Sequence, residues 1–270
     1  MRLRLAALFL MGLAGSAAAE PARLNPTRPT IVSLDYCADQ FVLALADREQ
    51  ILALSKDAER DFSHLRDKAA GIPKVRAAAE DVVALRPDVV VRSWGGDVRA
   101  LALYQRFGIR TVQIGYAADV DGAGELLRDV ASAIGQEARA EALLAARPER
   151  AKPSGQKALY VTPGGVSAGS ETMIDSIIGH AGLENANGGS GWTSLPLESL
   201  VMEPPALMLA AFFGFEDDAT DRWSVSRHPA MQRLMAKAQV IDMDESRVSC
   251  GAWFVADEAA DIAAALERRP

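Results

Sequence analysis

Large aromatic side chains and one arginine stand where predicted strands or a glycine-rich loop end, and these residues are best suited to bind a ligand. Aromatic residues form only 6% of the chain, so their concentration at such positions is informative. They suit a flat, bulky, partly apolar ligand, and a guanidinium suits an acidic group on it. Equally, these side chains would fill the space between two lobes. The candidates are Tyr36, Arg92, Trp94, Trp192, Phe213 and Trp253.

A second chemical pattern is G-x-S-x-G at residues 165–169, which in α/β hydrolases presents a nucleophilic serine, here Ser167. Aspartates within 217–221 and then His228 follow in the order that such enzymes use. However, Pro163 and Gly164 separate the motif from the preceding predicted strand, and no HGGG-type oxyanion segment comes earlier. A secreted serine hydrolase is therefore the alternative function, and we expect no enzyme.

The chain has two cysteines, Cys37 and Cys250, near opposite ends of the sequence. A disulfide requires these ends to meet in space; free thiols or a shared ligand contact are also compatible with the sequence. With only two cysteines and three histidines in the chain, we do not expect a closed structural zinc site. We expect no metal site and no cofactor of the protein's own.

The first 19 residues are typical of a secretory signal peptide. Arg2 and Arg4 precede an apolar run from Leu5 to Leu13, and the alanines at 17–19 form an A-x-A cleavage site. Removing these residues leaves about 251, enough for two lobes with their own cores. It also leaves 27 basic against 36 acidic residues, a net charge of −9, which disfavours nucleic acid as a partner.

Strand and helix patterns alternate along the remaining chain, which predicts an α/β fold. Several strands are apolar on both faces, as in parallel sheets covered by helices. Between two such series, residues 121–147 keep one helical period, which predicts a single connecting helix roughly 40 Å long. The predicted strands are 30–36, 51–55, 88–94, 111–116, 158–162, 206–213 and 239–243.

The two series contain similar segments that begin at Glu80 and Glu198, 118 residues apart. EDVVALRPDVVV and ESLVMEPPALML align without a gap, so that Pro87 matches Pro205. Each predicts a short helix with an acidic start, a proline break and a buried strand. The repeat predicts two similar lobes with a cleft between them: residues 20–120, a connecting helix at 121–150, and residues 151–270.

With SLDYCADQ after the first strand, ALRPDVVV and RSWGG, the chain resembles the periplasmic binding proteins for iron chelates and vitamin B12, which serve ABC importers. The resemblance covers nearly all of the mature chain, although Pro204 and Pro205 stand where the family more often has Pro-Asp. It implies two α/β lobes joined by one long helix, a ligand held between them, a monomer, and a periplasmic location.

The resemblance also implies roles for particular residues. Glu80 and Glu198 match glutamates that dock onto arginines of the two permease subunits, whereas their alternative role is to stabilise helix starts. Trp94 matches a cleft tryptophan of vitamin B12 binders, and Tyr36 would be the candidate axial ligand for haem. The expected cargo is therefore a cobalamin or other corrinoid, a ferric siderophore or haem, and the resemblance does not choose among them.

Overall fold

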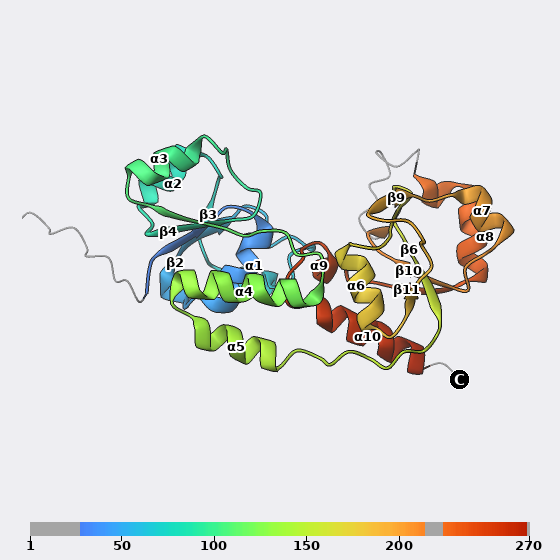
Figure 1. Ribbon diagram of the computed structural model, residues 1–270. Coiled ribbons are helices and arrows are strands. Elements are labelled where there is room, and N and C mark those ends of the chain that lie inside the picture. The colour runs from blue at the N-terminus through green and yellow to red at the C-terminus, as the bar shows by residue number, and fades with distance from the viewer. Residues whose placement is uncertain (1–27, 214–223, 269–270) are drawn as a thin grey trace, which may run out of the picture.

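The computed structural model describes residues 28–213 and 224–268, and it contains two α/β lobes side by side (Figure 1). The N-terminal lobe is a five-stranded parallel sheet in the order β3-β2-β1-β4-β5. The predicted signal peptide lies outside the described residues. The strands are β1 (Ile31–Ser33), β2 (Ile51–Ser55), β3 (Lys74–Val75), β4 (Val89–Arg92) and β5 (Arg110–Gln113); the helices are α1 (Tyr36–Leu45), α2 (Ala79–Leu85) and α3 (Ala100–Arg106).

The C-terminal lobe has a parallel sheet in the order β11-β10-β6-β8 and a separate antiparallel pair, β7 with β9. The predicted α/β class with mostly parallel sheets is therefore confirmed. The strands are β6 (Lys157–Val161), β7 (Val166–Ala168), β8 (Glu184–Asn185), β9 (Trp192–Ser194), β10 (Leu207–Ala210) and β11 (Gln239–Asp242). The helices are α6 (Met173–His180), α7 (Leu197–Met202), α8 (Pro229–Lys237), α9 (Glu245–Val248) and α10 (Val255–Glu267).

The internal repeat has a direct structural counterpart. Glu80 is the second residue of α2 and Glu198 the second residue of α7, and β4 and β10 begin at Val89 and Leu207. Both strands are buried along their whole length and pair in parallel on both sides. The continuous apolar runs thus form central strands covered on both faces, as expected for parallel sheets.

The prediction of a single connecting helix over residues 121–147 is wrong, because two helices occupy this stretch. α4 (Val120–Ile134) ends at Gly135, whose φ of 71° is left-handed and favours glycine. α5 (Glu137–Ala145) then runs back along α4, and Arg128 and Glu141 pair between them at 2.7 Å. The periodicity of the apolar residues continues through Gly135, which is why the pattern hid the break.

α4 nevertheless joins the lobes, because its two ends pack into different cores. Val120 and Ala123 belong to the hydrophobic core of the C-terminal lobe. Leu127, Val130 and Ile134 belong to the core of the N-terminal lobe. A helix of 15 residues, roughly 22 Å long, is therefore enough to cross between them.

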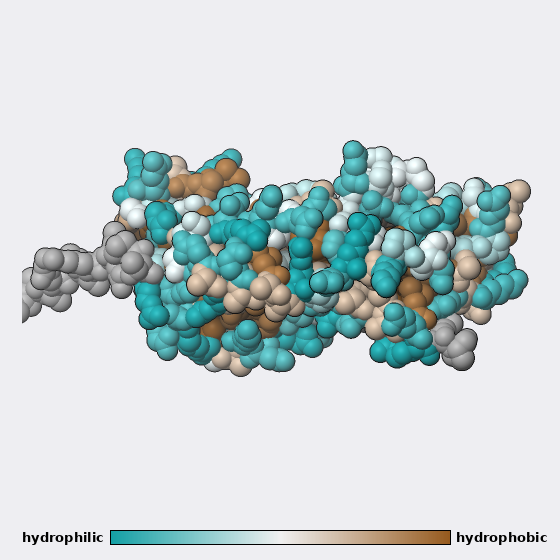
Figure 2. All heavy atoms as spheres, turned by 60° about the horizontal axis from the view of Figure 1, so that its bottom comes forward, coloured by the Kyte–Doolittle hydropathy of each residue, from teal (hydrophilic) through white to brown (hydrophobic). Residues whose placement is uncertain are grey.

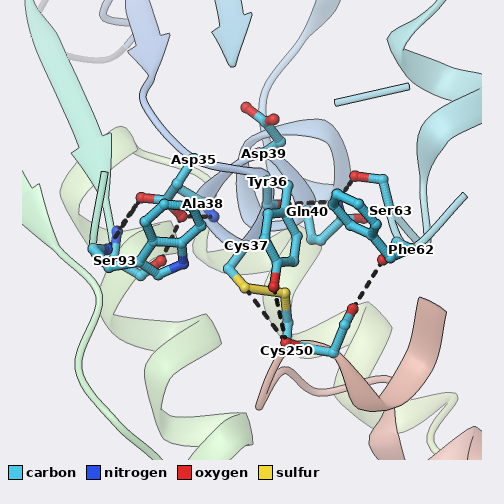
Figure 3. Close-up of a disulfide and its surroundings, with 12 residues drawn as sticks. Asp35, Tyr36, Cys37, Ala38, Asp39, Gln40, Phe62, Ser63, Ser93 and Cys250 are labelled. Carbon is cyan, nitrogen blue, oxygen red and sulfur yellow. Dashed lines mark hydrogen bonds between the residues drawn. A yellow bond between two sulfur atoms is a disulfide. The ribbon is translucent and has the colours of Figure 1, made fainter. Parts of the chain in front are cut away.

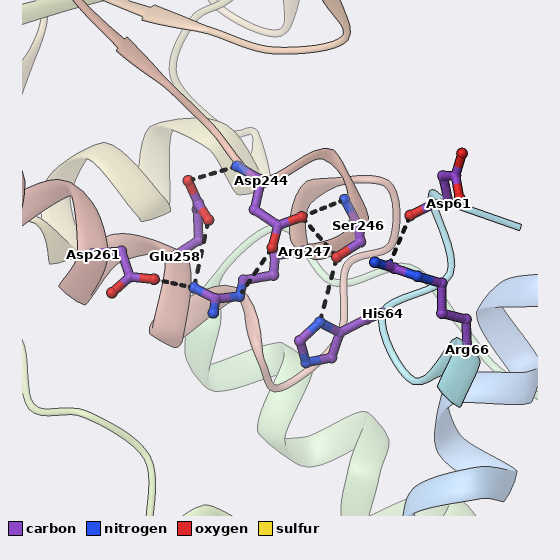
Figure 4. A network of polar contacts seen from close by, with 8 residues as sticks. All are labelled: Asp61, His64, Arg66, Asp244, Ser246, Arg247, Glu258 and Asp261. Carbon is purple, nitrogen blue, oxygen red and sulfur yellow. Dashed lines mark hydrogen bonds and ion pairs between the residues drawn. The ribbon is translucent and has the colours of Figure 1, made fainter. Parts of the chain in front are cut away.

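Residues 249–254 make another crossing, which we call the strap. Cys250, Trp253 and Phe254 pack in the core of the N-terminal lobe, whereas α10, directly after them, packs in that of the C-terminal lobe. A disulfide joins Cys250 to Cys37, the second residue of α1. Just before the strap, His64 of the N-terminal lobe contacts Ser246 within a polar network (Figure 4).

The face that carries α4, α5 and α10 is covered mostly by hydrophilic side chains, with smaller hydrophobic areas between them (Figure 2). Within the described ranges, no helix combines the length and apolar character that crossing a bilayer requires.

Candidate ligand-binding cleft

Asp35 organises the ends of β1 and β4, close to the predicted site residue Tyr36 (Figure 3). Its carboxylate caps α1 by accepting a hydrogen bond from the Ala38 N–H at 2.9 Å. It also accepts from the Ser93 hydroxyl and from the backbone N–H groups of Ser93, Trp94 and Gly95. Asp35 is almost fully buried, so this single side chain fixes the loop after β4 against the start of α1.

Gly95 is required for this close approach. A Cβ at that position would collide with the backbone carbonyl of Leu34. The glycine therefore lets the loop after β4 lie directly on the end of β1, and the loop carries Trp94 outward, where 58% of its surface is exposed.

A pocket of about 530 Å³ lies beside this loop. Tyr36, Trp94 and Tyr116 contribute aromatic walls from the carboxyl ends of β1, β4 and β5, and Ser249, Cys250 and Gly251 of the strap close one side. This is the edge of an open α/β sheet at which ligands bind. Because Tyr116 is 74% exposed, two large aromatic side chains are available to a ligand.

Tyr36 sits at the centre of the aromatic group. Its ring packs edge-on against Phe62 at 4.7 Å and against Trp94 at 5.6 Å between ring centroids. Its hydroxyl donates a long hydrogen bond to the Ser249 carbonyl, at 3.5 Å. Burial, and then the negative charge of Asp35 and Asp57, raises the pKa of Tyr36. The phenol is therefore protonated at neutral pH.

Asp35 and Phe62 are absent from the set of site residues expected from the sequence. An aspartate after a strand and before a helix is a recognisable helix cap, so Asp35 carried a local signal. Phe62 carried no such local signal, because it lies in an irregular loop before Leu65. The Gln40 side chain holds this loop by accepting a hydrogen bond from the Leu65 N–H at 2.7 Å. Only the folding of that loop onto α1 brings Phe62 to Tyr36.

Two residues that the sequence predicts to contact a ligand, Arg92 and Trp253, are buried. Arg92 is 5% exposed and lies under the loop after β4, where its guanidinium donates to the carbonyls of Trp94 and Gly96. As the last residue of a buried strand, it points inward and supports the loop. Trp253 is 8% exposed and packs against Phe41, with ring centroids 5.4 Å apart, because the strap inserts it into the N-terminal core.

Trp192 and Phe213 do not line the described pocket. Trp192, on β9, is 57% exposed and packs edge-on against Tyr160. β9 lies on the side of the C-terminal lobe nearer to the N-terminal lobe (Figure 1). Phe213 is partly buried and packs on the apolar cluster that contains Met208 and Met231. Trp192 is thus exposed to solvent, whereas Phe213 supports its own sheet.

Glu80 and Glu198 are both exposed in the first turn of their helices. The N-cap residues of α2 and α7, Ala78 and Pro196, make no side-chain hydrogen bond to the start of their helices. Within the described part of the chain, neither glutamate has a hydrogen-bond or ion-pair partner.

The hydrolase motif does not form a nucleophile site. Ser167 lies within β7, is 1% exposed, and its hydroxyl has no hydrogen-bond partner. A nucleophilic serine needs a base within hydrogen-bond reach and an exposed turn between strand and helix. His228 instead caps α8, where its Nδ1 accepts from the Ala230 N–H. The aspartates at 217–221 lie outside the described residues.

His, Cys, Asp and Glu do not gather in threes or more into a metal-binding group within residues 28–213 and 224–268.

Comparisons with known proteins agree with this fold. A family model described as "Periplasmic binding protein" matches residues 31–246. A sequence comparison with curated proteins gave no match.

Solved structures share the fold at low sequence identity. The periplasmic haem-binding protein HutB of Vibrio cholerae has 24% identity and a TM-score of 0.65, covering 88% of this chain and 98% of its own. A periplasmic haem-binding protein from Pseudomonas aeruginosa has 21% identity and a TM-score of 0.62, covering 88% of this chain and 92% of its own. The vitamin B12-binding protein BtuF of V. cholerae has 14% identity and a TM-score of 0.58, covering 88% of this chain and 96% of its own. Since the family model spans most of the sequence, from residue 31 to residue 246, this chain belongs to the periplasmic binding protein family.

Proposed function

We propose that this protein captures a bulky metal chelate in the cleft and delivers it to an ABC importer. The observation that carries the proposal is the pocket at the strand ends, where Trp94 and Tyr116 remain exposed around Tyr36. The similar solved structures, which include haem and vitamin B12 binders, support this class of cargo. The protein would reach the periplasm through residues 1–19 and act there as a monomer.

The aromatic side chains suit a planar macrocycle. Trp94 and Tyr116 offer ring faces for stacking, and the phenol of Tyr36 offers an oxygen that ferric iron accepts as an axial ligand. Because the pKa of Tyr36 is raised, coordination as phenolate would release a proton. Affinity for ferric haem should therefore rise by roughly tenfold per pH unit below that pKa. A corrinoid held by stacking alone would lack this dependence.

Delivery would use the carboxylates of Glu80 and Glu198. They occupy equivalent positions in the two lobes, so they can meet a two-fold permease dimer at equivalent basic side chains. Charge reversal of both, Glu80→Lys with Glu198→Lys, should abolish uptake of the chelate while leaving its affinity for the protein intact. Equal loss of affinity would instead assign both residues to the cleft or the fold.

The test is a tryptophan-fluorescence titration of the mature protein with haem, cobalamin, cyanide-capped corrinoid precursors and ferric siderophores. Exposed Trp94 and Trp192 should report binding, whereas Trp253 is buried. Saturable quenching by one class at micromolar or tighter affinity is expected. A Trp94→Ala variant should bind that class about 5- to 150-fold more weakly, or about 1–3 kcal/mol.

Tyr36→Phe separates the two modes of capture. If haem is the cargo and Tyr36 binds its iron, this variant loses the tyrosinate-to-iron absorption band and the pH dependence of affinity. A corrinoid held by stacking should bind the variant nearly as well as the wild type. Failure of every chelate to quench the wild-type protein would overturn the proposed function.

A further inference from the structure

The outer face of α7 combines a carboxylate with the most exposed large apolar side chain of the described residues. Glu198, Val201 and Met202 are spaced i, i+3 and i+4, which places them on one face of the helix. Val201 is 53% and Met202 83% exposed. Leu197 and Leu200, on the other face, pack on the C-terminal lobe and hold the helix in place.

The equivalent face of α2 differs in composition, although it occupies the matching place in the repeat. The residues 118 positions earlier are Glu80, Val83 and Ala84. Val83 is partly buried against the N-terminal core, and Ala84, while exposed, has only a methyl group to offer. Beside Glu80, Asp81 is held in an ion pair with Arg76 at 2.6 Å. The aligned positions of α2 therefore offer no large, mostly exposed apolar side chain, although Leu85, the residue after Ala84, is 39% exposed.

We propose that Glu198, Val201 and Met202 form an apolar docking patch for one subunit of the importer's permease, and that docking is stronger at the C-terminal lobe than at the N-terminal lobe. This inference rests on the proposed delivery to an ABC importer. The partner surface would present a basic side chain, complementary to Glu198, beside a hollow of apolar side chains that receives Met202.

Two physical arguments support stronger docking at the C-terminal lobe. An ion pair exposed to water contributes little on its own, so two glutamates alone would hold a partner weakly. Methionine is enriched at interface cores, because its unbranched, polarisable side chain adapts to an irregular apolar surface. Met202 is not needed for the fold of its own lobe, since α7 has no buried residue and is held through Leu197 and Leu200.

The experiment measures uptake of a radiolabelled chelate, haem or cobalamin as the titration identifies, into spheroplasts of the source cells that lack this gene. The mature binding protein is added at increasing concentration, and the half-saturating concentration reports docking. Met202→Gln should raise that concentration about fivefold or more. Met202→Leu, which keeps the apolar side chain, and Ala84→Gln, the matched change in the N-terminal lobe, should stay within about twofold. All three should bind the chelate with wild-type affinity.

The outcomes separate this inference from the function on which it rests. If Met202→Gln behaves like the wild type while the double reversal of Glu80 and Glu198 abolishes uptake, the apolar patch is overturned and delivery stands. Equal losses for Met202→Gln and Ala84→Gln would overturn the unequal docking of the lobes. If the wild-type protein neither binds a chelate nor supports uptake, the proposed function fails as well.

Discussion

At the scale of single residues, Asp35 matters more than any of the aromatic side chains it positions. It is buried, and it accepts hydrogen bonds from three consecutive backbone N–H groups of the β4 loop as well as from the start of α1. A carboxylate with so many donors stabilises both the helix cap and the cleft. The shape of the ligand pocket therefore depends on a residue that does not line it.

Replacing Asp35 by alanine should leave these buried N–H groups without an acceptor. We expect a loss of about 2–4 kcal/mol in the free energy of unfolding, together with weaker chelate binding because Trp94 loses its support. Urea unfolding and fluorescence titration measure the two effects. Ser93→Ala, which removes only one donor to Asp35, should lose about 1 kcal/mol. Equal losses for the two variants would contradict the central role of Asp35.

Glu258 on α10 makes stability depend on pH. It is 2% exposed, accepts the Asp244 N–H, and faces Arg247 of α9 at 3.8 Å; Asp244 and Asp261 also surround that arginine (Figure 4). Burial raises the pKa of Glu258 from 4.5 to about 7. Between these values the folded state binds the proton more tightly than the unfolded state, so this group lowers stability as the pH rises.

In the wild type, ionisation of Glu258 should lower the unfolding free energy by up to about 3 kcal/mol between pH 4.5 and 7. Glu258→Gln should remove this decrease. The amide keeps an acceptor for the Asp244 N–H and cannot ionise. Urea unfolding across this pH range measures the change, and Glu267→Gln, an exposed change on the same helix, is the control. An unchanged slope in Glu258→Gln would show that the carboxyl titrates as it does in the unfolded chain.

At the scale of elements, the α4–α5 hairpin depends on one glycine. Gly135 adopts a left-handed conformation that ends α4 and allows α5 to turn back along it. Gly135→Ala should lower the free energy of unfolding by about 1 kcal/mol, because a Cβ is disfavoured at a φ of 71°. Gly164→Ala, where a Cβ would meet nothing within 4 Å and φ is ordinary, should change stability far less. Equal effects would contradict this role for Gly135.

At the scale of the whole molecule, the strap and α4 are two of the connections between the lobes, and residues 146–156, between α5 and β6, make another. The disulfide closes a loop of 213 residues, and residues on both sides of it line the pocket. A pair of lobes tied in this way should change their relative position little when the cleft fills. Replacing Cys37 and Cys250 with serine removes the covalent part of this connection and leaves α4 intact.

The double serine variant should lose roughly 2–5 kcal/mol of unfolding free energy, because the unfolded chain is no longer cross-linked. Denaturant unfolding of oxidised, reduced and variant protein measures this. The reduced wild type should match the variant, and both should bind the chelate more weakly, since the strap is a wall of the pocket. An unchanged unfolding midpoint would mean that packing of Trp253 and Phe254 alone holds the strap.

By itself, the sequence determined the α/β class, the two lobes and the equivalent places of Glu80 and Glu198, because these follow from local periodicity and from a repeat at constant offset. Tyr36 and Trp94 were also predicted correctly to lie at strand ends, since the carboxyl edge of a parallel sheet follows from strand direction. The break at Gly135 was missed, because apolar periodicity continues through a residue whose conformation depends on packing. Only the tertiary structure decided that Cys37 meets Cys250, that Trp253 and Arg92 are buried, and that Phe62 reaches Tyr36. Each of these depends on contacts between segments far apart in the chain, and no local pattern encodes such contacts.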